Sequence, residues 1–357
     1  MNYLTADQRI ALLMHEGTDN PKGKTGLAML RYSPLKIVAV VDQRQAGNAL
    51  QAVTGIEREV PIVASVQAAL AFHPTVLAIG IAPSGGGLPA PWYQEVKTAA
   101  ALGLSIVNGL HTPLAQDAEL SSLLQPTQWI WDVRQEPLGL TIGSAAARLL
   151  PGRRVLAVGT DMAVGKMSTN LELHRLAVGR GLRSKVIATG QTNLMLGDDG
   201  IPLDAVRVDF AAGAVEQQVM RYGPDHELLF IEGQGSLFNP GSTATLPLMR
   251  GSQPTHLILV HRAGQSHIRS QPEIRIPPLS DAIQVCETIA TAGGSFLASK
   301  VVGIALNTRH LAIEEAKRAV CEVSQETQLP CTDAIRFGAE PLLEAILAAP
   351  IPLVPRP

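Results

Sequence analysis

Residues 155–169 decide the fold of this chain, and they read Val-Leu-Ala-Val-Gly-Thr-Asp-Met-Ala-Val-Gly-Lys-Met-Ser-Thr. The first four apolar residues are typical of a buried parallel strand, and the segment after the glycines favours a long helix. A strand, a glycine-rich loop and a helix in this order surround phosphate oxygens with backbone N–H groups. Glycine lets the backbone approach the anion, and Lys166 supplies a mobile positive charge. The stretch therefore predicts a phosphate-binding loop. Its candidate cofactor-binding residues are Gly159, Thr160, Asp161, Val164, Gly165, Lys166, Met167 and Ser168.

Met167 stands where a magnesium-using nucleotide site needs a serine or threonine hydroxyl. Ser168 follows it, but one residue along a helix is a rotation of about 100°, so its hydroxyl is expected to point elsewhere. The loop thus predicts that backbone and lysine bind a diphosphate without magnesium-dependent hydrolysis. Because the histidines follow no metal-ligand spacing, we predict no tightly bound structural metal.

Length and hydrophobic pattern predict two α/β domains. The chain has 357 residues, and a domain usually holds about 100–200. Short runs of Val, Ile and Leu alternate with longer Ala/Leu-rich segments, as buried strands alternate with helices. Proline and glycine are concentrated in residues 136–154 and mark the boundary. We predict a Rossmann-like parallel-sheet domain over residues 1–140 and a P-loop NTPase-like domain over residues 141–357.

The expected strands are Ile10–Met14, Ile37–Val41, Pro61–Val63, Val76–Ile81 and Ser105–Val107, then Val155–Val158, Lys185–Thr189, Glu227–Ile231, His256–Val260 and Val301–Leu306. The expected helices are Val66–Phe72, Gln94–Leu102, Gly165–Val178, Ala214–Tyr222, Ser280–Ala292 and Ile313–Thr327.

Composition limits the class of partner. The net charge is −2 and hydrophobic residues make up 46% of the chain, which excludes a disordered protein and gives no overall basic charge for nucleic acid. Three cysteines without a CxxC pair fit a reducing cytoplasm, and we expect neither a signal peptide nor a membrane-spanning segment. The expected partner is a small-molecule substrate rather than nucleic acid or a membrane, and a homo-oligomer remains open.

Three residues are candidates for catalysis. Glu232 ends an apolar strand and precedes a glycine-rich turn, at the sheet edge where ligands bind in open α/β folds. There it could hold a metal, orient an amine or act as a base. Asp209 is a similar candidate, with capping of the next helix as the alternative. His261 follows another strand and can accept a proton near neutral pH.

Substrate-binding candidates gather after the strands. Arginine can bind a carboxylate through two parallel hydrogen bonds, and uncharged side chains after a strand suit recognition, although turn capping explains them equally well. The candidates are Gln191, Thr192, Arg262, His267, Arg269 and Arg275. We expect Arg275 to lie in an ordered loop before two prolines. Asn307 follows the last expected strand and could read a purine edge or cap a helix.

Residues 17–25 contain the same frame as residues 159–166 of the phosphate loop. This frame is Gly-Thr-Asp, then three further residues, then Gly-Lys. This segment is either a second phosphate loop or a turn between a strand and a helix, because only a short helical segment follows it before Pro34.

The P-loop resembles that of dethiobiotin synthetase, whose pattern is Gly-Thr-Asp-Thr-x-Val-Gly-Lys-Thr and whose later strand ends in Glu-Gly-x-Gly. Residues 232–235 repeat the second pattern, and Met167 departs from the first. Over nearly its whole length the chain resembles the DgcN family. The resemblance rests on the N-terminal half, the Gly-Lys-Met-Ser loop, Ala188–Thr192, Asp209-Phe210 and His261–Arg269. It implies a Rossmann-like domain followed by a P-loop domain, and N-acetylation of D-glutamate by acetyl-CoA.

Acyl transfer is the leading functional hypothesis, because acetyl-CoA carries a diphosphate that the loop could hold without hydrolysing anything. Glu232, His261 or Asp209 would be the base, and Arg262, Arg269 or Arg275 would bind the carboxylates. The first alternative is an ATP-dependent ligase or kinase in which Asp209 and Glu232 hold magnesium. The second alternative is a nucleotide-binding regulator without chemistry.

Overall fold

The computed structural model describes residues 4–82 and 87–352, which form two compact units. Residues 1–135 and 191–198 belong to the first unit, and residues 136–190 and 199–357 belong to the second. The division after residue 135 lies five residues before the expected boundary. The short segment 191–198 joins the first unit although it comes from the second half of the sequence.

The first unit is a six-stranded parallel sheet in the order β3-β2-β1-β4-β5-β6, which is the strand order of dinucleotide-binding Rossmann folds. The expected α/β class with a Rossmann-like sheet is thus confirmed. Its strands are β1 (Arg9–Leu13), β2 (Lys36–Val41), β3 (Ile62–Val63), β4 (Val76–Ile79), β5 (Ser105–Asn108) and β6 (Ile130–Asp132). Its helices are α1 (Lys24–Tyr32), α2 (Leu50–Thr54), α3 (Val66–Ala69), α4 (Ala90–Ala101), α5 (Ala118–Leu123) and α7 (Gln191–Leu196).

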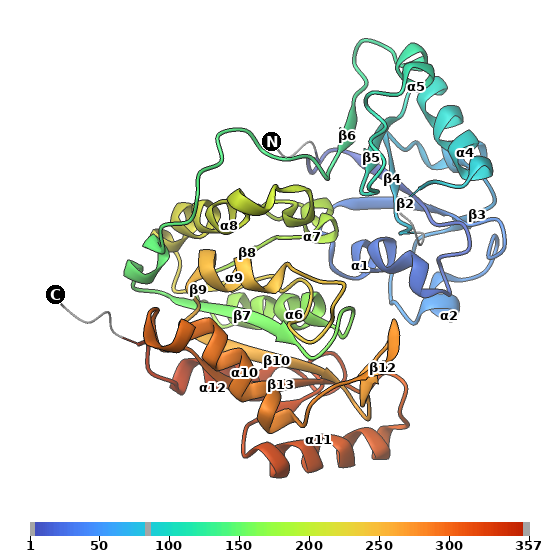
Figure 1. Ribbon diagram of the computed structural model, residues 1–357. Coiled ribbons are helices and arrows are strands. Elements are labelled where there is room, and N and C mark those ends of the chain that lie inside the picture. The colour runs from blue at the N-terminus through green and yellow to red at the C-terminus, as the bar shows by residue number, and fades with distance from the viewer. Residues whose placement is uncertain (1–3, 83–86, 353–357) are drawn as a thin grey trace. The chain divides into compact units, whose positions relative to one another are not determined.

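The second unit is another six-stranded parallel sheet, in the order β14-β13-β10-β7-β9-β8 (Figure 1). Its strands are β7 (Arg153–Gly159), β8 (Ser184–Ile187), β9 (Leu228–Ile231), β10 (His256–Arg262), β13 (Lys300–Asn307) and β14 (Cys331–Thr332). A separate antiparallel hairpin consists of β11 (His267–Ile268) and β12 (Gln271–Arg275). Its helices are α6 (Lys166–Gly179), α8 (Val208–Tyr222), α9 (Thr245–Ser252), α10 (Leu279–Thr291), α11 (Ile313–Thr327) and α12 (Glu340–Ala348).

Helices cover both faces of this second sheet. Helices α8, α9, α10 and α11 share one hydrophobic core with the strands, whereas α6 and α12 pack against each other outside that core. The central strand β7 lies between β10 and β9, and all of its residues after Arg153 are buried. The phosphate loop therefore leaves the middle of the sheet at the carboxyl ends of the strands, where ligands bind in α/β folds.

Two sequence expectations were wrong and one helix was not expected, and all three differences bear on the site. The helix expected at Ala214–Tyr222 begins at Val208, so Asp209 lies in its first turn. Arg275 ends strand β12 instead of lying in a loop. Gln191 and Thr192 begin helix α7, all of whose residues are buried.

The first glycine loop owes its pattern to close packing within the first unit. A Cβ on Gly23 would lie 2.0 Å from the carbonyl oxygen of Gly17, and one on Gly80 would lie 3.0 Å from the Cα of Gly26. The Thr25 hydroxyl lies 3.1 Å from the hydroxyl of Thr192 in α7. Packing between backbone segments and a contact between α1 and α7 thus account for these glycines and for Thr25.

Among residues 4–82 and 87–352, no helix combines the length and the apolar character needed to cross a bilayer.

Candidate phosphate and substrate site

The phosphate loop connects β7 to α6 through two residues in the left-handed backbone region. Ala163 has φ 54° and Gly165 has φ 122°, a conformation that costs a residue with a side chain about 1 kcal/mol or more. Helix α6 begins directly after Gly165, so its first N–H groups, which have no partner within the helix, face the loop. The predicted strand, loop and helix are confirmed, with the start of the helix one residue from the expected position.

The Lys166 side chain is buried and folds back over the loop. Its Nζ donates to the carbonyl oxygen of Asp161 at 3.0 Å, and a Cβ on Gly159 would lie only 2.8 Å from that Nζ. Burial lowers the pKa of Lys166 to about 8, while the charges of Asp161 and Glu232 act to raise it. The ammonium is therefore cationic at neutral pH and held within the loop. An anionic phosphate is the group that such a cation would bind.

Asp161 holds the loop to two other segments. One carboxylate oxygen accepts from the Met162 N–H at 2.6 Å and from Nδ2 of Asn239 at 2.8 Å. The other accepts from Nε2 of Gln265 at 2.7 Å and from the Arg269 N–H at 2.9 Å. Burial alone would raise the pKa of this carboxyl, but the hydrogen bonds lower it overall. Since four protein donors engage the carboxylate, Asp161 is a positioning residue of the loop.

Glu232 follows β9 and faces the loop from the neighbouring strand. Its buried carboxylate accepts from the N–H groups of Thr189 at 2.9 Å and Gly190 at 3.0 Å. The turn after it passes close to β7, since a Cβ on Gly233 would lie 1.7 Å from the carbonyl oxygen of Ala157. Glu232 thus joins the ends of β8 and β9 and places a negative charge near Lys166.

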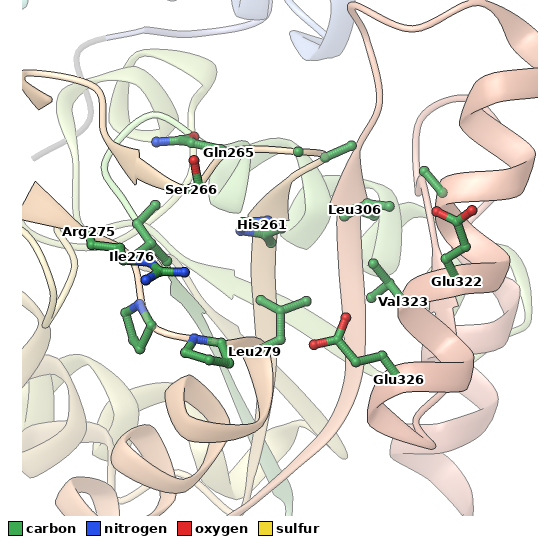
Figure 2. A pocket seen from close by; sticks show the side chains of 15 residues that line it. His261, Gln265, Ser266, Arg275, Ile276, Leu279, Leu306, Glu322, Val323 and Glu326 are labelled. Atoms are coloured by element: carbon green, nitrogen blue, oxygen red, sulfur yellow. The ribbon is translucent and has the colours of Figure 1, made fainter.

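His261 connects the loop to a pocket. Its Nδ1 lies 2.8 Å from the hydroxyl of Thr160, and its ring also lines a pocket of about 360 Å³ at the ends of β10 and β13. Burial lowers the pKa of His261 to about 4, so the imidazole is neutral at physiological pH and is a weaker proton acceptor than an ordinary histidine. Figure 2 shows His261 between the labelled side chain of Arg275 and the Glu326 side chain of the opposite wall.

Asn307 supports the loop from β13. Its Nδ2 donates to the carbonyl oxygen of Val164 at 2.8 Å, and its Oδ1 accepts from the Arg309 N–H at 3.2 Å. The residue is therefore next to the loop, as expected of a cofactor-binding residue, but these two bonds are internal to the protein. Met167 and Ser168 lie half-buried in the first turn of α6.

The remaining candidates lie at varying distances from this cluster. Arg262 is half-buried at the end of β10, and the side chains of His267 and Arg269 are exposed near the hairpin. Asp209 is exposed in α8, and no hydrogen bond among the described residues joins it to the loop. Gln191 and Thr192 belong to the first unit.

Sequence reasoning missed four residues of the site. Asn239 and Gln265 contact Asp161 from 78 and 104 residues away in the chain, a relation that no local pattern reveals. Glu322 and Glu326 line the pocket from α11, and their spacing of four residues does predict a shared helix face. Within the part of the chain that the structure describes, no group of three or more His, Cys, Asp or Glu residues could hold a metal ion.

Comparisons with known proteins cover both units. Residues 43–136 match the domain of unknown function DUF1611_N, described as a Rossmann-like domain, and residues 141–343 match DUF1611_C, described as a P-loop domain. A D-glutamate N-acetyltransferase of Tritonibacter scottomollicae is 37% identical over 286 residues, which cover 80% of this chain and 84% of that protein. A D-glutamate N-acetyltransferase of a Pseudoalteromonas species is 34% identical over 270 residues, which cover 74% of this chain and 79% of that protein. The crystal structure of a DUF1611 family protein from Anabaena variabilis is 62% identical with a TM-score of 0.94, and the match covers 96% of this chain and 100% of that one.

Proposed function

The chain belongs to the DUF1611 family, and from this premise we propose that it is an N-acetyltransferase that moves the acetyl group of acetyl-CoA to the amine of D-glutamate or of a similar amino acid. The names of two relatives support the reaction class, since each match covers about three quarters or more of both chains. The phosphate loop supports the donor, because coenzyme A carries a diphosphate and a ribose phosphate that backbone N–H groups and Lys166 could bind.

The observation that carries this proposal is the absence of a suitably placed hydroxyl at the start of α6. Met167 follows the loop lysine, and the next hydroxyl, that of Ser168, is one residue further round the helix. The Thr169 hydroxyl donates to the carbonyl oxygen of Gly165 at 3.1 Å, so it is engaged by its own helix. A loop that keeps the lysine without this hydroxyl is suited to bind a diphosphate that is not hydrolysed.

In the proposed reaction the amine nitrogen attacks the carbonyl carbon of the thioester. A C–N bond forms, the C–S bond breaks, and the sulfur leaves as a thiolate. The nitrogen becomes acidic once it has attacked, so a neutral base can take one proton from it, and the protonated base returns that proton to the thiolate. The products are the N-acetyl amino acid and the thiol of coenzyme A.

His261 is the base that we favour among the three candidates. Its imidazole is neutral at physiological pH and lies in the wall that the loop and the pocket share. The Glu232 carboxylate is instead engaged by the N–H groups of Thr189 and Gly190, and the Asp209 side chain is exposed on α8.

One observation favours a second function. Glu232 ends the strand beside the phosphate loop, and its charge partly opposes the lowering of the Lys166 pKa by burial. An acid in this place could hold magnesium for an ATP-dependent ligase or kinase. That function requires magnesium, whereas the proposed acetyl transfer does not.

The experiment is an assay of thiol release from acetyl-CoA with D-glutamate, with L-glutamate and without acceptor, each in EDTA and in magnesium. Release that needs D-glutamate and proceeds in EDTA is the expected result. No release with either acceptor, together with ATP hydrolysis in magnesium, would favour the ligase or kinase instead.

A further inference from the structure

The pocket beside His261 carries charges of opposite sign on opposite walls. The side chain of Arg275, from hairpin strand β12, lines one wall, and Glu322 and Glu326 of α11 line the other. Figure 2 shows this arrangement, with His261 between the two walls. All three charged residues are exposed to solvent.

These three charges have no ionic partner within the part of the chain that the structure describes. Other exposed charges on the same helix are paired, as Lys317 is with Glu314 at 2.8 Å. An arginine and two glutamates that face one cavity without pairing leave room for a ligand that carries both a negative and a positive group. Arginine binds a carboxylate through two parallel hydrogen bonds, and a glutamate carboxylate accepts hydrogen bonds from an ammonium.

Several apolar side chains lie between the charged walls of the pocket. Ile276 and Leu306 line it and are almost completely buried, and Val323 lines it from α11. Such a surface suits methylene groups, which gain free energy when they leave water. Its volume of about 360 Å³ is within the usual range for a small-molecule site.

We propose that this pocket binds the acceptor as a zwitterionic amino acid, with its ammonium against Glu322 and Glu326 and a carboxylate against Arg275. This inference rests on the proposed acetyl transfer and adds the binding site of the acceptor to it. The ammonium end would then lie on the α11 side of His261, the residue that we favour as the base. The ammonium would release one proton to solvent before its nitrogen attacks the thioester, and His261 would take the second proton after the attack. Glu322 and Glu326 would select amino acids over dicarboxylates that lack an amine.

The test compares two ligands that differ only in the amine, D-glutamate and glutarate. Their binding is measured by isothermal titration calorimetry in saturating coenzyme A, for the wild type, Arg275→Gln and the double variant Glu322→Gln/Glu326→Gln. The matched controls are Arg318→Gln and Glu314→Gln, which change exposed charges of α11 that do not line the pocket. Melting temperatures verify that each variant is folded.

The double variant is expected to bind D-glutamate about tenfold more weakly or worse, and glutarate at least as well as the wild type does. Arg275→Gln is expected to weaken both ligands about tenfold, and the controls neither. Wild-type affinity for D-glutamate in both pocket variants, or no binding of either ligand to the wild type, would overturn the assignment.

Thiol release by the same proteins separates this inference from the proposed function. If the wild type acetylates D-glutamate and the pocket variants keep its KM, the pocket is wrong and the function stands. If the variants change ligand binding as expected but the wild type releases no thiol from acetyl-CoA, the pocket stands and the acetyl transfer is wrong.

Discussion

Replacing Asp161 by asparagine tests whether this carboxylate holds the phosphate loop together. Asparagine has nearly the same shape, but one of its two polar atoms is an NH2 group, which donates instead of accepting. Two of the four donors that face Asp161 would then meet another donor: either Met162 N–H and Asn239, or Gln265 and Arg269 N–H.

The magnitude follows from the burial of the site, since Asp161 is only 1% exposed and water cannot easily replace the lost partners. A hydrogen bond to a charged group contributes about 1.5–3 kcal/mol, so the loss of two should lower the free energy of unfolding by about 3 kcal/mol or more. For a unit of roughly 200 residues this lowers the melting temperature by about 6–12 °C.

The assay is thermal unfolding of the wild type, Asp161→Asn and the control Asp199→Asn. Asp199 is partly exposed and pairs with Lys185 at 2.8 Å, so its replacement should cost at most about 1 kcal/mol. The folded-state pKa of Asp161 is lowered, which means that its contribution is complete above the unfolded pKa of about 3.9 and is lost as pH falls through the folded value. The difference between the wild type and Asp161→Asn should therefore shrink in acid. A melting temperature for Asp161→Asn equal to that of the control would refute this role for Asp161.

Four further predictions concern the loop and the pocket. Lys166→Ala should raise the KM for acetyl-CoA at least about tenfold, which steady-state kinetics measures. The protein should stay folded, because burial of this ammonium contributes little stability, and a melting curve checks this. Because the pKa of Lys166 is about 8 and only its cationic form attracts phosphate, the affinity for coenzyme A should fall as pH rises above about 8; calorimetry that found equal affinity at pH 7 and 10 would contradict this. His261→Asn should lower kcat by about 10²–10⁴-fold with the affinity for coenzyme A unchanged, and wild-type kcat should show no protonation of His261 between pH 6 and 8, since its pKa is about 4. Gly165→Ala should destabilise the protein by about 1–2 kcal/mol, because φ at this residue is 122°. The control is Gly181→Ala, which measures the cost of a positive φ in an open turn away from the loop.

The sequence was sufficient for the phosphate loop and the central strands, because their signals are local. Four apolar residues before the glycines predicted β7, and the start of α6 was placed within one residue. Family resemblance based on this loop and on residues further along the chain was confirmed by the DUF1611 matches. By contrast, β6 has three residues and β14 has two, which is too short to show a periodic pattern of apolar residues, and the sequence analysis missed both strands.

Misleading local patterns and distant contacts account for the other failures. The helix expected at Ala214–Tyr222 starts at Val208, so Asp209 lies in its first turn, and the alternation of apolar and polar residues over 206–210 does not show a helix start. Helix α7 was missed because its first three residues are polar and follow a strand, which is typical of a turn. The contacts of Asp161 with Asn239 and Gln265 depend on the folded sheet, so only the structure could reveal them.

The central claim is that the phosphate loop binds coenzyme A through its phosphates without magnesium. Calorimetric titration of the wild type and Lys166→Ala with coenzyme A and with pantetheine, which lacks phosphate, tests this claim when all solutions contain EDTA. The account predicts that the wild type binds coenzyme A in EDTA, that pantetheine binds much more weakly, and that Lys166→Ala removes most of the difference. Equal binding of both compounds, or binding of coenzyme A that Lys166→Ala leaves unchanged, would contradict it.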